Sequence, residues 1–154
     1  MLKKTITYED YDGQQRTETF YFNLTEAEVQ RYNFEHSNEG LIEYLKSIIT
    51  TKNVKNMMDF IAELISISFG TKSEDGKRFI KDPALTRAFM QTEAYSQLYM
   101  ELVTEESAIT NFLMGCMPKK AFNNKALSNT SASDIKDFVY GNKDLKELGI
   151  NANT

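Results

Sequence analysis

Apolar and polar side chains alternate with a period of two along residues 2–8, which is the pattern of a β-strand with one covered face. Residues 11–14 (Tyr-Asp-Gly-Gln) are typical of a turn, and residues 16–22 are rich in Thr and aromatic side chains. These segments predict a β-hairpin in which Phe20 and Phe22 share one face. Because a two-stranded ribbon is marginal alone, we expect the hairpin to lie on helices or to pair with other chains.

After the hairpin the apolar spacing becomes helical. Thr25 is followed three residues later by Glu28, a capping-box signature that predicts a helix running to about Glu35. Apolar residues over 41–49 recur at helical spacing and predict a second helix, which ends in the polar segment 50–53. The chain therefore begins with strands and continues with helices.

Residues 54–69 make the most apolar helix candidate, and we place this helix at the centre of a bundle. Gly70 is expected to end it in a left-handed conformation. The polar segment 70–81 carries Asp75-Gly76 near its middle, which predicts a surface loop or a very short β-ribbon.

Three further helices are predicted before the composition changes. Asp82-Pro83 combines a capping side chain with a proline suited to the first turn, so a helix begins there. Another helix begins at Thr92 and covers residues 93–101. The last core helix covers residues 105–117 and is stopped by Pro118.

Charge and composition divide the chain at Pro118. Residues 1–118 hold 12 basic and 18 acidic side chains, whereas residues 119–154 hold six and four and are rich in Asn, Ser and Thr. We therefore predict one α+β domain over residues 1–118, an N-terminal β-hairpin packed on a mainly helical bundle of about five or six helices. Residues 119–154 are expected to form a loosely ordered tail that is either flexible or ordered by a partner.

Composition also narrows the classes of function. With a pI near 5.1, the acidic body is a poor partner for nucleic-acid phosphates. The longest apolar stretch, residues 57–69, is interrupted by carboxylates and is too short to span a membrane, and no secretory signal opens the chain. The single cysteine excludes a disulfide framework. These observations predict a cytoplasmic protein that binds neither nucleic acid nor membranes.

Candidate catalytic residues are few. The only histidine, His36, falls in a polar segment and is predicted to be a solvated turn residue, and the only cysteine, Cys116, is predicted to be a core thiol. The carboxylates of Asp59 and Glu63 are expected on a solvated helix face. The segment 70–77 lacks the spacing of a phosphate-binding loop and the ligands of a calcium site. We predict no enzyme activity, no cofactor and no metal.

An apolar surplus remains in the last two predicted core helices. Tyr95, Leu98, Tyr99 and Leu102 form one stripe, and such a stripe lies in a core more often than at an interface. Methionine, however, is favoured at surfaces that accept variable helical partners. We therefore propose a helix-binding groove or self-assembly face, and its candidate partner-binding residues are Tyr95, Tyr99, Met100, Leu113, Met114 and Met117.

Four segments together resemble the tail assembly chaperones of long-tailed phages and prophages of Gram-positive bacteria. They are Lys-Thr-Ile-Thr-Tyr (4–8), Phe-Tyr-Phe-Asn-Leu-Thr-Glu-Ala-Glu (20–28), the loop over 70–81, and Gln-Thr-Glu-Ala-Tyr-Ser (91–96). The Asp-Gly loop with its Arg-Phe-Ile-Lys end and the Gln-Thr-Glu-Ala-Tyr segment are the more specific parts. The resemblance covers about residues 2–118.

The resemblance implies a non-enzymatic chaperone of the host cytoplasm that is absent from the finished virion. Its implied partners are the tape-measure protein, which it coats and shields, the tail-tube protein, and a frameshift-extended form of itself; a homo-oligomer is a further option. Two alternatives stay open: a structural tail or connector component retained in the virion, and a small regulatory protein-binding module. An enzyme ranks after both.

Overall fold

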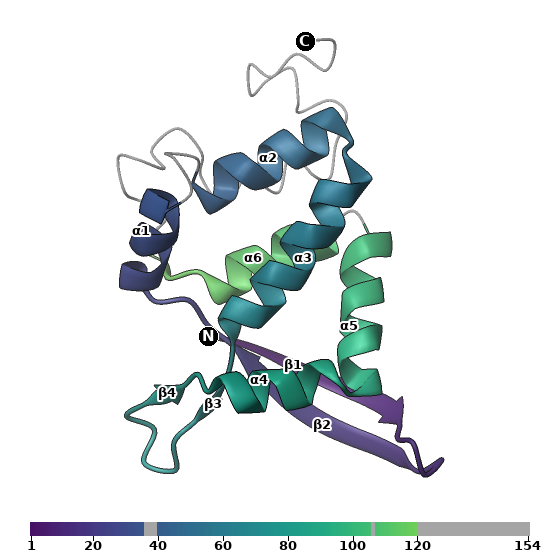
Figure 1. The fold of residues 1–154 in the computed structure, drawn as a ribbon. Coiled ribbons are helices and arrows are strands. Elements are labelled where there is room, and N and C mark those ends of the chain that lie inside the picture. Colours follow the sequence, from purple (N-terminus) through teal and green to yellow (C-terminus); the bar gives the residue numbers. More distant parts are fainter. Residues whose placement is uncertain (36–39, 106, 120–154) are drawn as a thin grey trace.

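The computed structural model describes residues 1–35, 40–105 and 107–119, and within these ranges it contains four strands and six helices. The strands gather at one end of the molecule, and helix α2 lies at the opposite end (Figure 1). This arrangement confirms the predicted α+β class, with an N-terminal hairpin against a mainly helical body. Of the predicted tail over 119–154, only Lys119 lies within the described residues.

The hairpin consists of β1 (Leu2–Glu9) and β2 (Gln15–Phe22), which pair antiparallel over eight consecutive residues. Its turn is held by the Asp10 carboxylate, which accepts hydrogen bonds from two backbone N–H groups of the turn and from Arg16 Nε at 2.7 Å. The Arg16 guanidinium holds the pKa of Asp10 below its usual range. Gly13 adopts φ +77°, so the turn needs a residue that tolerates a left-handed backbone.

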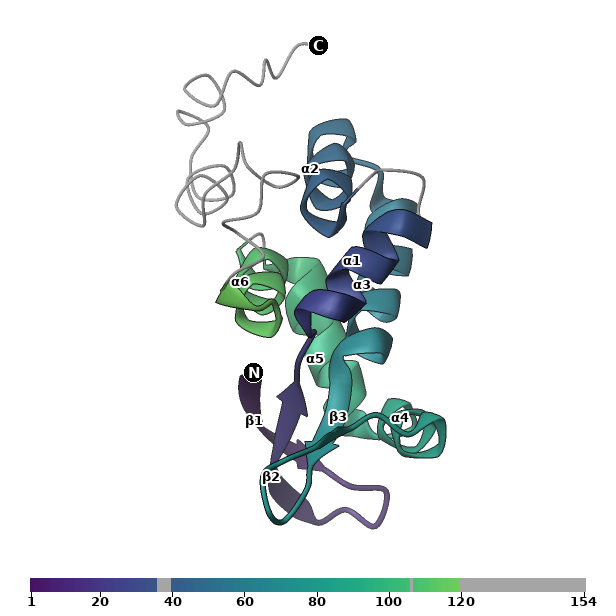
Figure 2. The same cartoon turned by 90° about the vertical axis from the view of Figure 1, so that its left-hand side faces the viewer.

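Two short strands extend the hairpin into a larger sheet. Strand β3 (Phe69–Lys72) pairs with β2, and β4 (Phe79–Ile80) pairs with β3, giving the order β1-β2-β3-β4 with every neighbour antiparallel. The predicted short ribbon is confirmed, with Gly76 at φ +71° in its turn. Its pairing with β2 was not predicted, because only the fold brings the two segments together. Figure 2 shows β1, β2 and β3 side by side.

The prediction that Gly70 ends a helix is wrong. Helix α3 (Val54–Ser68) is followed by Phe69, whose backbone is already extended, and Gly70 lies inside β3. A Cβ atom on Gly70 would lie 2.7 Å from the carbonyl oxygen of Ile80. The glycine is therefore needed because β4 approaches the backbone closely, and not because the chain turns there.

Helices α1 (Glu26–Glu35) and α2 (Leu41–Thr51) follow the sheet's first two strands and match the predicted elements. The capping box is formed as predicted: Thr25 N donates to Glu28 Oε2 at 2.7 Å, and Glu28 N donates to Thr25 Oγ1 at 3.2 Å. Lys52 ends α2 in a left-handed conformation, φ 51°. Local side-chain chemistry thus sets where α1 begins.

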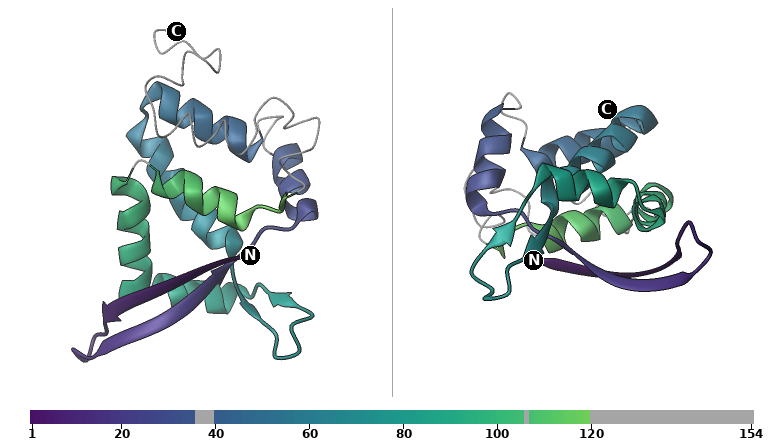
Figure 3. Two further views of the ribbon diagram at one scale, coloured as in Figure 1. Left: turned by 180° about the vertical axis from the view of Figure 1, so that it is seen from behind. Right: turned by 60° about the horizontal axis from the view of Figure 1, so that its bottom comes forward.

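Helices α4 (Pro83–Met90) and α5 (Glu93–Thr104) begin at the predicted caps. Asp82 accepts a hydrogen bond from Ala84 N at 2.8 Å, and Thr92 Oγ1 accepts one from the Tyr95 backbone N–H at 3.2 Å. These caps fix the directions of two helices that flank the sheet, and Figure 3 shows from behind how both lie against the hairpin end of the molecule.

Helix α6 (Ala108–Cys116) begins three residues later than the predicted 105–117 and ends before Pro118. It packs on the start of the hairpin, where a Cβ on Gly115 would meet the Leu2 side chain. The Leu24 N–H also donates to the Cys116 carbonyl at 2.9 Å. The first strand and the last described helix are therefore joined directly.

One hydrophobic core connects the sheet with the helices. Phe22 is fully buried, and its ring lies 4.9 Å from that of Phe112 and 5.9 Å from those of Phe69 and Phe89, measured between ring centroids. The expected cover over Phe20 and Phe22 is therefore present, since the Phe20 ring also lies 4.8 Å from Phe89. This aromatic cluster joins β2 to α4 and α6.

Helix α3 supplies the centre of the helical part, as predicted. Phe60, Ile61, Leu64 and Ile65 are buried, and the helix packs on α2, α5 and α6. Val54 in its first turn is exposed, so the N-terminal end of α3 lies outside the core.

Candidate functional site

Helix α5 presents one buried row and two flanks of different character. Ala94, Leu98 and Leu102 recur every fourth residue and are almost wholly buried in the core. On one flank the helix meets the hairpin, and on the other it carries the half-buried side chains of Tyr95 and Tyr99. The buried row fixes the helix, so both flanks are held in place.

The hairpin flank is closed by polar contacts. Lys4 Nζ lies 2.6 Å from Glu101 Oε1, and Tyr11 Oη donates to Glu93 Oε1 at 3.1 Å. The hydrogen bond to Glu93 raises the pKa of Tyr11 above its ordinary value, so the phenol stays protonated at neutral pH. These contacts hold the hairpin along α5 at two points, one in β1 and one in the turn.

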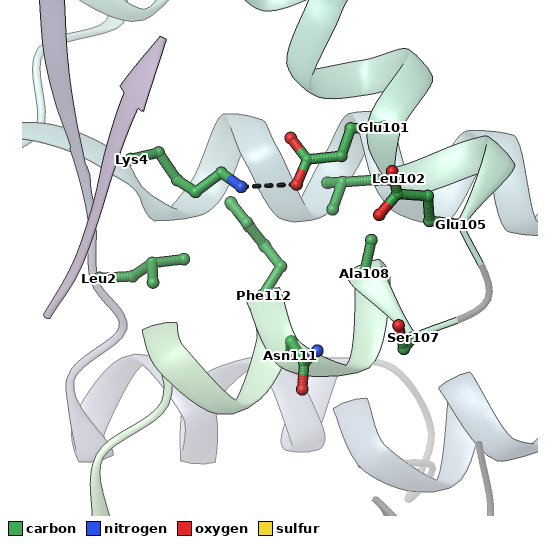
Figure 4. Close-up of a pocket in the computed structure, with 9 residues that line it drawn as sticks. All are labelled: Leu2, Lys4, Glu101, Leu102, Glu105, Ser107, Ala108, Asn111 and Phe112. Carbon is green, nitrogen blue, oxygen red and sulfur yellow. Dashed lines mark hydrogen bonds and ion pairs between the residues drawn. The ribbon is translucent and has the colours of Figure 1, made fainter. Parts of the chain in front are cut away.

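A cavity of about 200 Å³ lies beside this flank, between β1, α5 and α6. Figure 4 shows the Lys4 ammonium pointing at Glu101 and the Phe112 ring extending from α6 toward the same pair. The residues that line the cavity include neither histidine nor cysteine. Its lysine is already paired with Glu101.

The opposite flank of α5 carries a row of aromatic contacts. The Tyr95 ring lies 5.8 Å from that of Phe89 and 6.0 Å from that of Tyr99, and Tyr99 Oη donates to the Met58 carbonyl at 3.5 Å. Burial raises the pKa of Tyr95, and the nearby Tyr99 adds to this. The row therefore joins α4, α5 and the first turns of α3, and Tyr95 stays uncharged at neutral pH.

The two helices that this row contacts also carry exposed apolar side chains. Met58 of α3 is 39% exposed, and Leu85, one turn before Phe89 on α4, is 42% exposed. We call the set formed by Met58, Leu85, Tyr95 and Tyr99 the tyrosine surface. It is apolar in composition and carries phenol hydroxyl groups, a combination that is enriched at protein interfaces.

Met100 lies on a different part of α5 from the tyrosines. It is 51% exposed and sits about 100° around the helix from Tyr99, by the geometry of 3.6 residues per turn. Its exposure makes it accessible to a partner, but it is not part of the tyrosine surface. Tyr99 and Met100 thus lie on different faces of α5.

The predicted residues of α6 and its end lie mainly in the core. Leu113 is 1% exposed and Met117 is 4% exposed, whereas Met114 is half-buried. Their spacing on an apolar helix does not distinguish a core face from a binding face, and here the α3 and α5 helices cover them. Of the six candidate residues, Met100 is exposed, Tyr95, Tyr99 and Met114 are half-buried, and Leu113 and Met117 are covered; their role in binding a partner stays a prediction.

Candidate catalytic groups do not form a reactive site in the described residues. Cys116 is fully buried, as predicted, and burial raises the pKa of its thiol to about 12, so the thiol is protonated at neutral pH. His36 lies outside the described residues. Of the predicted solvated carboxylates, Asp59 is exposed, whereas Glu63 is half-buried and accepts a hydrogen bond from Tyr32 at 3.4 Å.

The part of the chain that the structure describes shows neither a metal site nor a membrane-spanning helix. No group of three His, Cys, Asp or Glu side chains in residues 1–35, 40–105 and 107–119 is placed to hold a metal ion. Over the same residues, each helix is too short or too polar to cross a bilayer.

Sequence reasoning missed the neighbours of the tyrosines. Nothing in the local pattern places Met58 beside Tyr99, because the two are joined only by the packing of α3 on α5. The ion pair between Lys4 and Glu101 spans most of the chain and was missed for the same reason. The one available signal was the i, i+4 spacing of Tyr95 and Tyr99, which the sequence analysis used.

Comparison with known proteins yields one match. No curated protein and no solved structure matches the chain significantly. A family model described as phage tail assembly chaperone matches residues 1–148, which includes all of the described residues and most of the segment after Pro118. Because this match covers nearly the whole chain, the protein belongs to the phage tail assembly chaperone family.

Proposed function

We propose that this protein binds and shields the tape-measure protein of a tailed phage and helps to recruit tail-tube subunits, without catalysing a reaction. Family membership supports a role in tail assembly. A tape-measure protein is a long amphipathic helix, and its apolar stripe would aggregate before the tube encloses it. A chaperone of such a partner needs an accessible apolar surface of its own.

The observation that carries this proposal is the tyrosine surface. Tyr95 and Tyr99 are one turn apart on a helix whose neighbouring row is fixed in the core, and both rings pack partly against that core, so they are held in place before any partner arrives. Rigid aromatic anchors lose little conformational entropy on binding. Met58 of α3 and Leu85 of α4 add exposed, adaptable apolar side chains on the helices that pack against α5.

The geometry suits a helical partner. Two side chains at i and i+4 spacing offer a stripe about one helical turn long, and the neighbouring α3 and α4 residues widen it. An amphipathic helix binds such a surface through its own apolar residues at i, i+3 and i+4. We propose that the tyrosine surface contacts the apolar stripe of the tape measure.

Co-expression with the tape-measure protein of the same phage tests the proposal. Tyr99→Glu places a charge on the tyrosine surface and should abolish capture of the tape measure, whereas Met100→Glu places the same charge on the adjacent, different face and should leave capture intact. Circular dichroism of both variants checks that each is folded. Equal capture by wild type and folded Tyr99→Glu would exclude this surface, and loss with Met100→Glu alone would move the site to the other face.

We further propose that the protein acts in the host cytoplasm and is absent from the mature virion, as an assembly factor should be. Mass spectrometry of purified virions is the test. Its absence, with tube and tape-measure peptides detected, would support a chaperone. Stoichiometric peptides of this chain in the particle would instead favour a structural tail or connector component.

A frameshift-extended form of the chain is a further proposed partner, and it rests on the family assignment alone. The coding sequence around the C-terminal residues should contain a slippery run followed by an overlapping reading frame. Immunoblotting of infected cells with an antibody to the N-terminal domain should then show two products. A single product would contradict this part of the proposal.

A further inference from the structure

The two edges of the sheet differ in length. Strand β4 contributes only two residues, and such a short edge gives little opportunity for further pairing. Strand β1 forms the opposite edge over eight residues, without a bulge and without a proline. In Figure 2, β1 lies at one edge of the sheet, next to β2, and β3 follows beyond β2. Long, regular edges of this kind are templates for adding a strand.

The hydrogen-bond pattern identifies the groups on this edge. Asp10 N donates to the Gln14 carbonyl at 2.8 Å, directly continuing the register that pairs Glu9 with Gln15. Because antiparallel pairs alternate between bonded and non-bonded residues, even-numbered residues of β1 bond to β2. The odd-numbered residues therefore direct their N–H and C=O groups outward, away from β2; they are Lys3, Thr5, Thr7 and Glu9, and all four have exposed side chains.

The order of these four side chains is self-complementary. In an antiparallel pair of identical strands with Thr5 opposite Thr7 of the second copy, Lys3 lies opposite Glu9 of that copy, and the reverse contacts follow by symmetry. All four outward residues then form bonded pairs. Shifting the register by two residues in either direction loses these charge pairs, so the edge specifies one arrangement.

We propose that two copies of this chain associate through antiparallel pairing of their β1 strands, with Lys3 of each facing Glu9 of the other. The two sheets become one continuous sheet, and Ile6 lies at the two-fold axis. The order of charges favours a second copy of this chain as the partner strand. A matching strand must carry an acidic and a basic residue as far apart as Lys3 and Glu9 are, and β1 itself does so. This interface is separate from the tyrosine surface and does not depend on the proposed binding of the tape measure.

Charge reversal tests the pairing. Sedimentation equilibrium should show a dimer for wild type, and Lys3→Glu and Glu9→Lys should each raise the dimer dissociation constant by about tenfold or more, since two attractive contacts become repulsive. The double variant Lys3→Glu/Glu9→Lys should restore wild-type association. An equimolar mixture of the two single variants should also form dimers, because each then supplies the charges that the other lacks.

A proline variant tests the hydrogen bonds separately. Thr5→Pro removes an outward N–H and the side-chain bond to Thr19 but leaves the backbone bonds to β2 intact, so it should give a folded monomer. Lys4→Pro removes an inward backbone bond and should disturb the hairpin itself. Circular dichroism distinguishes the two results. A wild-type monomer at every concentration, which would also arise if another segment of the chain covers the edge, overturns the proposal. So does a dimer that is insensitive both to charge reversal and to Thr5→Pro.

Discussion

One continuous series of aromatic contacts has a buried end and an exposed end. Phe112, Phe22 and Phe89 lie in contact within the core, and Phe89 in turn meets Tyr95, which meets Tyr99 at the surface. The rings are similar in size and in their mutual distances. The two ends differ in solvent exposure. The buried end holds the fold together, whereas the exposed end is available to a partner.

At the buried end, the rings join elements that are distant in sequence. Phe22 comes from β2, Phe89 from α4 and Phe112 from α6, so this end stabilises the fold through tertiary contacts. At the exposed end, both tyrosines come from α5 and the helix would keep its place without them, because Leu98 and Leu102 anchor it. The tyrosines are therefore free to serve binding at little cost in stability.

The largest predicted effect is at the buried end. Phe22→Ala should lower the free energy of unfolding by about 3–5 kcal/mol, because a fully buried ring with three aromatic neighbours is lost and a cavity remains. Tyr99→Ala, the matched change at the exposed end, should cost about 1 kcal/mol. Urea unfolding of both variants measures the difference, and equal losses would contradict the division between the two ends.

A smaller, pH-dependent effect is predicted where α1 meets the segment before α4. Lys81 Nζ lies 2.7 Å from Glu28 Oε1. Burial raises the pKa of Glu28, but the bonds from Lys81 and the Thr25 N–H outweigh it, so the pKa falls below its ordinary value. A lowered carboxyl pKa stabilises the fold above the unfolded pKa, about 4.5, and this stabilisation is lost as the pH falls through the folded pKa.

The variant Glu28→Gln isolates this charge, because glutamine can still complete the capping box. It should be less stable than wild type by about 0.5–1 kcal/mol at pH 7. The difference should shrink once the pH falls below the lowered pKa, where Glu28 of the wild type is protonated. Unfolding free energies measured across acidic to neutral pH test this, and a constant difference would show that the charge is not responsible.

The smallest predicted effect concerns the hairpin flank of α5. Lys4→Met keeps the apolar stem of the side chain and removes the ion pair with Glu101, which is partly exposed. It should cost about 0.5 kcal/mol and should leave capture of a tape-measure protein unchanged. Urea unfolding measures the stability, and co-purification measures the capture. A loss of capture would show that the hairpin flank of α5 takes part in binding and is not purely structural.

Local chemistry made most of the elements predictable. The caps at Thr25, Asp82 and Thr92 act within one turn, so the sequence predicts where their helices begin. Gly70 was misinterpreted because its role depends on β4, a contact that no local pattern encodes. The candidate site divides in the same way: the spacing of Tyr95 and Tyr99 was visible in the sequence, whereas the burial of Leu113 and Met117 depends on the helices that cover α6.

The central claim is that the exposed end of the aromatic series binds the tape-measure protein. The most direct measurement is capture of that protein on co-expression with the double variant Tyr95→Ser/Tyr99→Ser, together with its unfolding free energy. We predict that the variant stays folded and loses capture, while Met100→Ser retains capture. A folded double variant that captures the tape-measure protein as well as wild type does would contradict the claim.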